Sequence, residues 1–122
     1  MTTLMFKERF AAKVASGDKQ QTIRPQRAHP IKVGEALSLR KWEGLPYRSR
    51  QVELVRAVCV RTTPIEILSH SVILDTNDNL TDRLQDFAIA DGFESWGHMR
   101  DWFDETHGLP FVGVLIKWEL QL

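Results

Sequence analysis

The longest run of alternating apolar and polar residues, residues 50–62, constrains the fold more than any other feature of this sequence. Val52, Leu54 and Val58 lie at even spacing within it, and two residues is the period of a β-strand with one buried face. A second run, residues 111–120, is apolar along most of its length, which is typical of a strand in the middle of a sheet. The sequence therefore predicts a protein built around a β-sheet.

The N-terminal segment predicts an amphipathic helix. Phe6, Phe10 and Val14 recur at four-residue spacing, which places them on one helix face. Gly17 follows, and glycine is the commonest residue at a left-handed helix end. The polar segment that comes next contains two prolines, and we interpret it as a short strand followed by a long basic loop.

Three more helices are predicted in the second half of the chain. Thr63 and Pro64 have the chemistry of an N-cap and a first helical position, which predicts a short helix there. Residues 81–90 predict a second helix that stops at a glycine. Ser95 is the expected N-cap of a third, whose apolar side is rich in tryptophan and phenylalanine.

The order of these elements favours an α+β fold. Strands are also predicted over residues 35–42 and 72–74, and helices interrupt the strands without regular strand–helix–strand units. A small, mostly antiparallel β-barrel with flanking helices fits this order best. We expect one domain over residues 1–122, because the length is usual for a single domain and no repeat or linker is present.

The composition excludes several classes of protein. It is that of a globular chain, with 43% hydrophobic and 26% charged residues. The single cysteine, Cys59, cannot form an internal disulfide, and no cysteine or histidine cluster has zinc spacing. No apolar run approaches 18 residues, and the N-terminus lacks a signal-peptide pattern. We expect a cytoplasmic protein that uses no metal, cofactor or membrane.

A net charge of zero hides a strong asymmetry between the two halves of the chain. Residues 1–61 contain 13 lysines and arginines against 5 acidic residues, whereas residues 62–122 contain 3 against 11. A basic surface is the usual footprint of a polyanionic partner such as RNA. The alternative is that the two halves pack together and neutralise each other.

The segment from Gly17 to Arg24 is the first candidate site. In an extended strand Ile23 would point into the core, and Thr22 and Arg24 would share the opposite face. Lys19, in the preceding turn, can bend towards Thr22. A desolvated Lys19 could activate the Thr22 hydroxyl, or it could remain charged and stabilise an oxyanion. An ordinary surface turn between a helix and a strand has the same residue types.

Asp91 is the second candidate. It follows the last turn of a predicted helix, where the negative end of the helix dipole disfavours a carboxylate. A raised pKa would suit a general acid or base. The alternative is a solvated aspartate in the turn that ends the helix.

Basic and aromatic residues outside these segments are candidate contacts to a nucleic acid. Arg27 and the basic loop around it could follow a phosphate backbone, as could the arginines near residue 50. Trp42 stands beside Arg40 and Lys41, so it is the best of the four tryptophans for stacking on a base. Trp96 and Trp102 lie on an apolar helix stripe, which favours core packing.

Several of these residues resemble the signature of ASCH domains, a branch of the PUA-like superfamily. The matching positions in the first segment are Phe6, Phe10, Val14, Gly17, Lys19, Thr22 and Arg24. Asp91-Gly92-Phe93 is similar to the acidic-Gly-Phe step before the last helix of that family. Leu109-Pro110-Phe111 and the strand after it are similar to the closing strand. The resemblance spans nearly the whole chain.

The resemblance implies a PUA-like barrel with a cleft that takes RNA or a modified nucleoside. Some small bacterial members are amidohydrolases that remove the acetyl group of acetylated cytidine with a Lys, a Thr and a Glu. On that pattern Lys19 and Thr22 would be catalytic, and Asp91 would stand where the family has Glu. Aspartate reaches about 1.5 Å less far than glutamate, because it is one methylene shorter.

We therefore expect an amidohydrolase acting on an acylated pyrimidine nucleoside, with catalytic residues Lys19, Thr22 and Asp91. The expected ligand-binding residues are Arg9, Arg24, Arg27 and Trp42. The alternative is a non-catalytic RNA-binding module that uses the same cleft. A ribonuclease is a further alternative, although no histidine pair or metal set suggests one.

Overall fold

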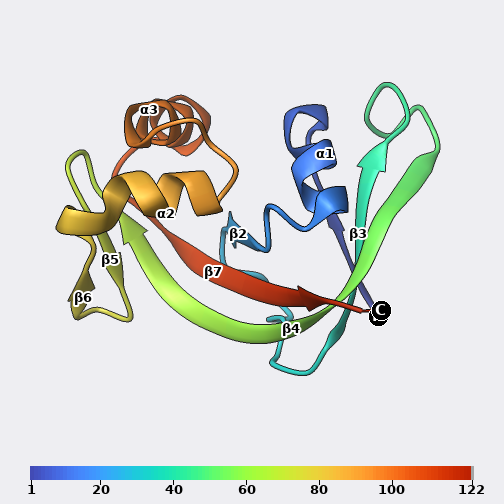
Figure 1. Ribbon diagram of the computed structural model, residues 1–122, viewed down its shortest axis with the longest axis horizontal. Helices are drawn as coiled ribbons and strands as arrows, with labels where there is room; N and C mark the ends of the chain where they lie inside the picture. The colour runs from blue at the N-terminus through green and yellow to red at the C-terminus, as the bar shows by residue number, and fades with distance from the viewer. Residues whose placement is uncertain (122) are drawn as a thin grey trace.

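The two strongest strand patterns of the sequence form the centre of the sheet. In the computed structural model, which describes residues 1–121, they are β4 (Gln51–Ile67) and β7 (Phe111–Leu120) (Figure 1). They pair antiparallel from Ala57↔Leu120 to Ile67↔Phe111. β2 (Gln21–Arg24) pairs with the other edge of β7. Strands on both edges of β7 explain its apolar composition, as predicted for a central strand.

The remaining strands extend the sheet to either side of β4. They are β1 (Thr2–Met5), β3 (Ala36–Trp42), β5 (Val72–Leu74) and β6 (Asp78–Asn79). The order along the sheet is β1-β3-β4-β5-β6, with β2 reached through β7. β1 runs parallel to β3, and the other pairs are antiparallel.

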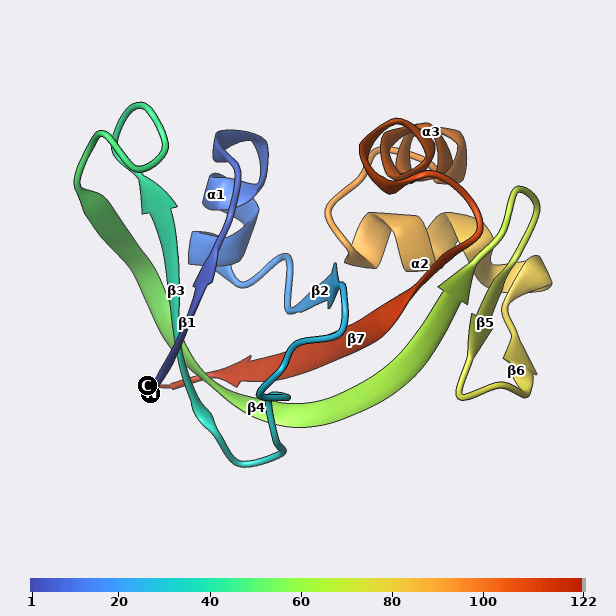
Figure 2. The same cartoon turned by 180° about the vertical axis from the view of Figure 1, so that it is seen from behind.

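The sheet is not closed, so the predicted barrel is wrong, while the α+β class is confirmed. Among residues 1–121, β1, β2 and β6 each pair with one strand only. Closure requires the two outer strands of a sheet to hydrogen-bond to each other. Instead α1 (Glu8–Ser16) follows β1 and packs on β3 and β4. Figures 1 and 2 show the helices on the concave side of the curved sheet, so they fill its interior.

The helices that the sequence predicts on either side of residue 91 are present. A 3-10 turn, Thr81–Arg83, leads into α2 (Leu84–Ala90), and α3 (Trp96–His107) follows. The Ser95 side chain accepts a hydrogen bond from the His98 backbone N–H, so Ser95 is the predicted N-cap. α2 and α3 pack on each other at one end of the sheet, and α1 lies at the other (Figure 1).

The short helix predicted at Thr63 and Pro64 does not form, because β4 continues through both residues to Ile67. Pairing with β7 overrides the local helix signal, because Thr63 and Pro64 lie opposite Leu115 and Val114 and are held in the extended conformation. The Pro64 carbonyl accepts a hydrogen bond from Asp75 N at 2.9 Å. The Pro64 nitrogen, which has no hydrogen to donate, faces the same side of β4 as this carbonyl. The β4–β5 pairs begin only at Ile65, so no strand hydrogen bond is lost at Pro64.

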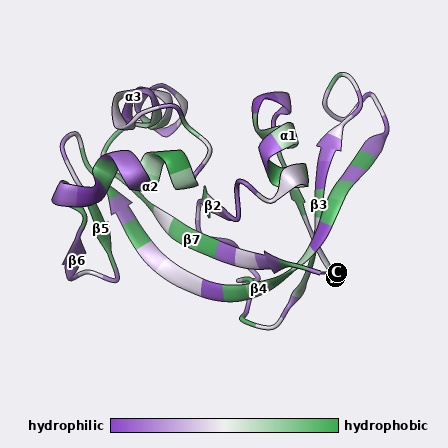
Figure 3. Ribbon diagram, viewed as in Figure 1, coloured by the Kyte–Doolittle hydropathy of each residue, from purple (hydrophilic) through white to green (hydrophobic). Residues whose placement is uncertain are grey.

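One apolar core joins the sheet to the helices. In Figure 3 hydrophobic and hydrophilic residues are interspersed along β4. Its buried apolar side chains are Ala57, Cys59, Ile65 and Ile67, whereas Val52, Leu54 and Val58 of the predicted apolar face are only partly buried. Phe10 of α1 packs edge-on against Phe93, with ring centroids 5.3 Å apart, and Phe93 packs against Trp102 and Phe103 of α3. This aromatic cluster spans the space between α1 and α3, and the candidate site lies beside it.

Candidate active site

The end of α1 fixes the position of Lys19. Gly17 adopts φ +87°, a left-handed conformation that glycine tolerates best, and its N–H bonds to the carbonyl of Val14. The Lys19 backbone N–H then bonds to the carbonyl of Lys13 at 3.0 Å. The chain turns back under the helix, and the Lys19 ammonium lies 4.9 Å from the ring centroid of Phe10.

The end of α2 fixes the position of Asp91. Its N–H bonds to the carbonyl of Phe87, and the N–H of Phe93 bonds to that of Ala88. Gly92 between them adopts φ +97°, and a Cβ there would lie 3.0 Å from Cδ of Lys19. A glycine at this position therefore allows the Lys19 side chain to lie against the chain next to Asp91.

Lys19 and Asp91 form a buried ion pair between segments that are far apart in the sequence. The Lys19 Nζ lies 3.6 Å from Asp91 Oδ1, and it also donates to the Asp91 backbone carbonyl. The exposed fractions of the two residues are 2% and 3%. Gln21 donates from Nε2 to the same carboxylate oxygen at 3.2 Å. The structure thus places Asp91 in the interior, not in a solvated turn.

Burial shifts both members of the pair towards their neutral forms. It lowers the pKa of Lys19 from 10.5 to about 8, although the Asp91 carboxylate opposes this shift. It also raises the pKa of Asp91, against the opposing effects of Lys19 and the Gln21 hydrogen bond. The sequence also predicts a raised pKa for Asp91, but the leading cause is burial and not the helix dipole. Both shifts bring the pair closer to exchanging a proton near neutral pH, which suits a proton donor and acceptor.

Thr22 and Arg24 share one face of β2, as the alternation predicts. Arg24 Nε donates to Thr22 Oγ1 at 3.1 Å, and its Nη2 donates to the Met5 carbonyl at 2.7 Å. The guanidinium also lies 4.8 Å from the ring centroid of Phe6. Burial lowers the pKa of Arg24 to about 10, so the side chain keeps its charge at neutral pH.

These residues surround one cavity of about 310 Å³ between α1, β2 and α3. Lys19, Thr22, Arg24 and Asp91 all contribute to its lining. The remaining walls are mainly aromatic and apolar: Met5, Phe6, Phe10, Ile23, Phe93, Trp102 and Phe103, with Lys7, Pro25, Thr106 and His107. A mostly apolar cavity with a few convergent polar groups is the usual form of a small-molecule site.

Lys19 and Thr22 line the cavity without a hydrogen bond between them in residues 1–121. The Lys19 ammonium is turned towards Asp91, and the Thr22 hydroxyl accepts from Arg24. Because each group is bonded to another partner, a proton passing from Thr22 to Lys19 needs a bridging water or a rotation of the lysine. Contacts of this kind often tighten only when a substrate is bound.

The other predicted ligand-binding residues lie outside the lining of this cavity. Arg9 is at its rim, with its guanidinium 5.3 Å from the ring centroid of Phe93. Arg27 lines a separate cavity under the loop after β2. Trp42 ends β3 and packs against Tyr47, with ring centroids 5.1 Å apart. The roles predicted for Arg9, Arg27 and Trp42 stay predictions.

Sequence reasoning missed Gln21, which completes the site by binding the Asp91 carboxylate. A signal was available, because Gln21 and Ile23 are two residues apart and therefore share a face of β2. A glutamine on the face that points to the core needs a buried partner. The partner itself could not be read from the sequence, since Asp91 is 70 residues away in the chain.

In residues 1–121 no three His, Cys, Asp or Glu side chains are grouped to hold a metal ion. None of the helices described is long and apolar enough to cross a membrane. Comparison of the chain with protein-family models, curated proteins and solved structures finds no match.

Proposed function

We propose that this protein is a hydrolase that removes an N-acyl group from an acylated pyrimidine nucleoside such as N-acetylcytidine. The observation that carries the proposal is the buried Lys19–Asp91 pair at 3.6 Å, lining one cavity together with the hydroxyl of Thr22. Amide hydrolysis needs a nucleophile, a base and an acid for the leaving amine. Thr22, Lys19 and Asp91 supply those three groups.

In the first step the Thr22 oxygen attacks the acyl carbon, and the hydroxyl proton passes to the neutral amine of Lys19 through a bridging water or after the lysine side chain has rotated. The bond between the acyl carbon and the exocyclic nitrogen then breaks. Neutral Asp91 gives its proton to that nitrogen, and the free nucleoside leaves. Burial favours both starting forms, because it lowers the pKa of Lys19 and raises that of Asp91.

In the second step water hydrolyses the acyl ester on Thr22. The water gives one proton to the Asp91 carboxylate, and the Lys19 ammonium returns a proton to the Thr22 oxygen as the ester bond breaks. A carboxylic acid is released, and each residue regains its starting state. Arg24, which donates to the Thr22 oxygen at 3.1 Å, holds this nucleophile in place.

The resemblance to ASCH domains supports the same assignment from the sequence. Lys19, Thr22 and Asp91 are the positions that match that family's catalytic pattern, and they lie around one cavity. Asp91 departs from the glutamate of the pattern by one methylene. Because the Lys19 Nζ lies against both the side chain and the backbone carbonyl of Asp91, the shorter carboxylate still has its lysine partner.

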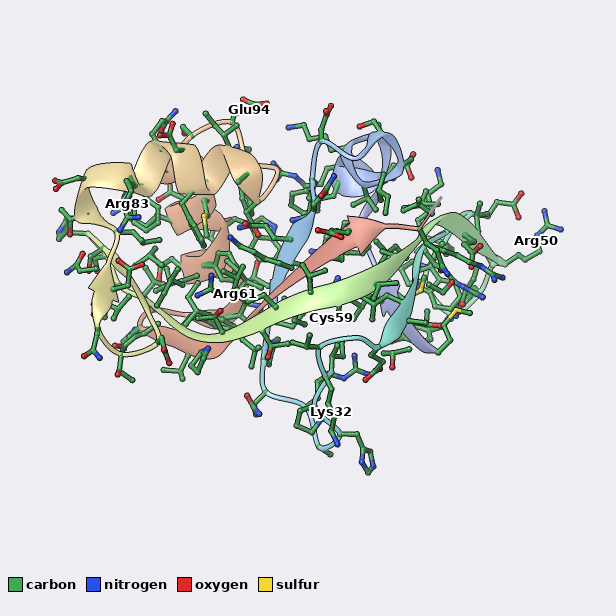
Figure 4. The ribbon with its side chains drawn as sticks, turned by 60° about the horizontal axis from the view of Figure 1, so that its bottom comes forward. Lys32, Arg50, Cys59, Arg61, Arg83 and Glu94 are labelled. Carbon is green, nitrogen blue, oxygen red and sulfur yellow. The ribbon has the colours of Figure 1, made fainter. Side chains whose placement is uncertain are left out.

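The test is to incubate the purified protein with N-acetylcytidine and to follow the release of cytidine by chromatography. We expect conversion by the wild type and a loss of at least about a hundredfold in Lys19→Ala, the lower range for a general acid or base. Lys32→Ala is the matched control, because Lys32 lies on an exposed loop away from the cavity (Figure 4). No conversion by the folded wild type would overturn the proposal.

The pH dependence tests the role of Lys19 separately. If Lys19 is the base, kcat/KM should rise with pH as the Lys19 ammonium, with its pKa of about 8, loses its proton, and it should fall again once Asp91, the proposed acid, loses its own. A rate that does not rise towards pH 8 would instead require the ammonium form, which stabilises an oxyanion. Thr22→Ser should keep activity and Thr22→Val should lose it, because only serine retains a hydroxyl.

A second candidate function, binding of single-stranded RNA, is favoured by the hairpin that joins β3 and β4. Tyr47 in this hairpin is 89% exposed although it packs on Trp42. It adopts φ +61°, a conformation that is strained for a tyrosine. Arg48 and Arg50 are exposed on the same hairpin. Exposed aromatic rings beside cations are typical of stacking surfaces for unpaired bases.

A further inference from the structure

A second cavity, of about 360 Å³, lies between the sheet and α2. Its floor consists of Gln21 of β2, Arg61 and Thr63 of β4, and Leu115 and Lys117 of β7. Its walls come from β5, β6, the turn before α2, and α2 itself: Leu74, Asp78, Leu80, Arg83, Asp86, Phe87 and Ala90. We call it the α2 groove. The reaction proposed above takes place in the other cavity.

Two cations in the floor of the α2 groove face each other without a partner. Arg61 and Lys117 are directly opposite on β4 and β7, so their Cα atoms lie about 5 Å apart. Within residues 1–121 neither side chain forms an ion pair or a side-chain hydrogen bond. Like charges directly opposite on neighbouring strands are destabilising. An anion between them would remove that cost.

A β-bulge creates this juxtaposition. The pairing of β4 with β7 shifts by one residue between Cys59 and Arg61, where Val60 is the extra residue. Without the shift, Arg61 would lie opposite Ile116 and point to the other face of the sheet. Bulges commonly redirect a side chain next to a functional site. Here the bulge turns Arg61 towards Lys117 and into the α2 groove.

The other charged groups of the groove leave an excess of positive charge. Arg83 pairs with Asp78 at 2.8 Å, so these two residues largely neutralise each other. Asp86 of α2 is the remaining carboxylate in the lining. Arg61 and Lys117 therefore outnumber Asp86 by one charge. Figure 4 shows Arg61 on β4 and Arg83 at the start of α2, with Arg50 at the opposite end of the molecule.

We propose that the α2 groove is a binding site for a phosphomonoester group, held between Arg61 and Lys117. A phosphomonoester carries nearly two negative charges at neutral pH, and arginine and lysine are the side chains that bind it best. The apolar wall of Leu74, Leu80 and Phe87 can cover an uncharged body attached to the phosphate. The ligand is thus free phosphate or the phosphate of a monoester with an uncharged body, for which a nucleoside monophosphate serves as the probe.

The groove touches the hydrolase site through two residues. Gln21 lines the α2 groove and also donates to Asp91 Oδ1 at 3.2 Å. Ala90 lines the groove and immediately precedes Asp91 in the chain. An anion bound in the groove is therefore separated from the Asp91 carboxylate by one side chain. The Gln21 side-chain amide is a natural reporter of whether the groove is occupied.

The test is a titration of the wild-type protein with inorganic phosphate, followed by NMR of backbone and side-chain amides at constant ionic strength set with chloride. We expect saturable shifts at Arg61, Lys117 and the Gln21 side-chain amide. Arg61→Gln and Lys117→Gln should each weaken phosphate binding about tenfold, the effect of losing one charged hydrogen bond. Arg56→Gln is the control and should bind like the wild type, because Arg56 is an exposed arginine of β4 that lies outside the groove lining and pairs with Glu53.

Asp86→Asn sharpens the test because it should act in the opposite direction. Removal of this carboxylate removes a repulsion, so phosphate binding should become tighter. A parallel titration with cytidine 5′-monophosphate and with cytidine distinguishes the two sources of the phosphate. Tighter binding of the monophosphate than of phosphate identifies a nucleotide, and equal binding identifies free phosphate. Either result supports the anion site.

Three results would overturn the proposal: shifts that do not saturate, shifts that chloride reproduces, or equal weakening in Arg56→Gln and Arg61→Gln. Cytidine that binds as well as its monophosphate, at the same amides, would also do so. The titration contains no acylated substrate and measures no hydrolysis. If the proposed hydrolase activity fails, the phosphate titration is unaffected. If phosphate does not bind, the hydrolase proposal is likewise unaffected.

Discussion

The Lys19–Asp91 pair gives the protein a pH dependence of stability that can be measured. The folded state lowers the pKa of Lys19 from 10.5 to about 8. Between these two pH values the unfolded chain binds more protons than the folded one, so the unfolding free energy rises with pH. Relative to Lys19→Met, the wild type should gain about 3 kcal/mol from pH 8 to pH 10.5.

Urea unfolding at a series of pH values measures this difference. Lys32→Met is the control, because Lys32 is an exposed lysine outside the buried pair. A constant difference between the wild type and Lys19→Met across that range would show that the buried lysine titrates normally.

Gly92 provides a second test at the scale of a residue. Gly92→Ala should destabilise the protein for two reasons, the left-handed φ of +97° and the crowding of a Cβ 3.0 Å from Lys19 Cδ and Phe10 Cδ1. Gly34→Ala is the matched control, because Gly34 has a similar φ of +90° but a Cβ added there would have no atom within 4 Å. Gly34→Ala should cost about 1 kcal/mol in unfolding free energy, and Gly92→Ala clearly more.

Only Gly92→Ala should also reduce hydrolysis of N-acetylcytidine, because it displaces the Lys19 side chain. Equal losses of stability and equal activity in the two variants would contradict the close packing at the site.

At the scale of the element, α3 closes one side of the cavity lined by Lys19 and Thr22, and its start depends on Ser95. The Ser95 side chain accepts the His98 N–H at 3.1 Å. Ser95→Ala should therefore lower the unfolding free energy by about 1 kcal/mol, the usual cost of losing an N-cap. Ser16→Ala is the control, because Ser16 lies at the exposed end of α1 and caps no helix start. Thermal unfolding of the wild type and both variants measures the loss of unfolding free energy, which should be larger in Ser95→Ala than in Ser16→Ala.

The elements also show where local signals fail. Thr63 and Pro64 have the composition of a helix start, but pairing with β7 on one edge and β5 on the other keeps this part of β4 extended. β1 carries no strong pattern of its own, because it has only four residues and is formed by its pairing with β3. In both segments tertiary contacts decide the conformation, and local propensity is too weak to do so.

At the scale of the whole molecule, the basic and acidic halves of the chain do not neutralise each other by ion pairing. Among residues 1–121 the exposed pairs lie within one half, as in Lys41–Glu8 and Arg83–Asp78. The pair that joins the halves is Lys19–Asp91, which is buried. The first half therefore keeps an excess of exposed positive charge.

That excess predicts binding to a short single-stranded RNA that weakens as salt rises, because phosphate contacts release counterions. Arg48→Gln combined with Arg50→Gln should weaken binding and reduce the slope of log affinity against log salt by about one unit or more. Tyr47→Ala should weaken binding without changing the slope, since stacking involves no counterion. Fluorescence anisotropy at several salt concentrations measures each effect. An unchanged slope in the double arginine variant would show that the hairpin does not contact the RNA phosphates.

The sequence by itself determined the sheet-centred α+β class, the central position of β7, the three amphipathic helices and the shared face of Thr22 and Arg24. These features follow from two- and four-residue periods and from local caps, which act between near neighbours in the chain. It also singled out Lys19, which lies in the turn before β2 and can bend towards Thr22, and Asp91, which follows the last turn of a predicted helix.

Only the tertiary structure decided that Lys19 and Asp91 are buried and paired, that Gln21 joins them, and that the sheet stays open. It also decided that the Val60 bulge turns Arg61 towards Lys117. Each of these depends on how segments far apart in the chain pack, and on the register between strands. A change of one residue in register reverses the face of a side chain, and no local pattern in the sequence records it.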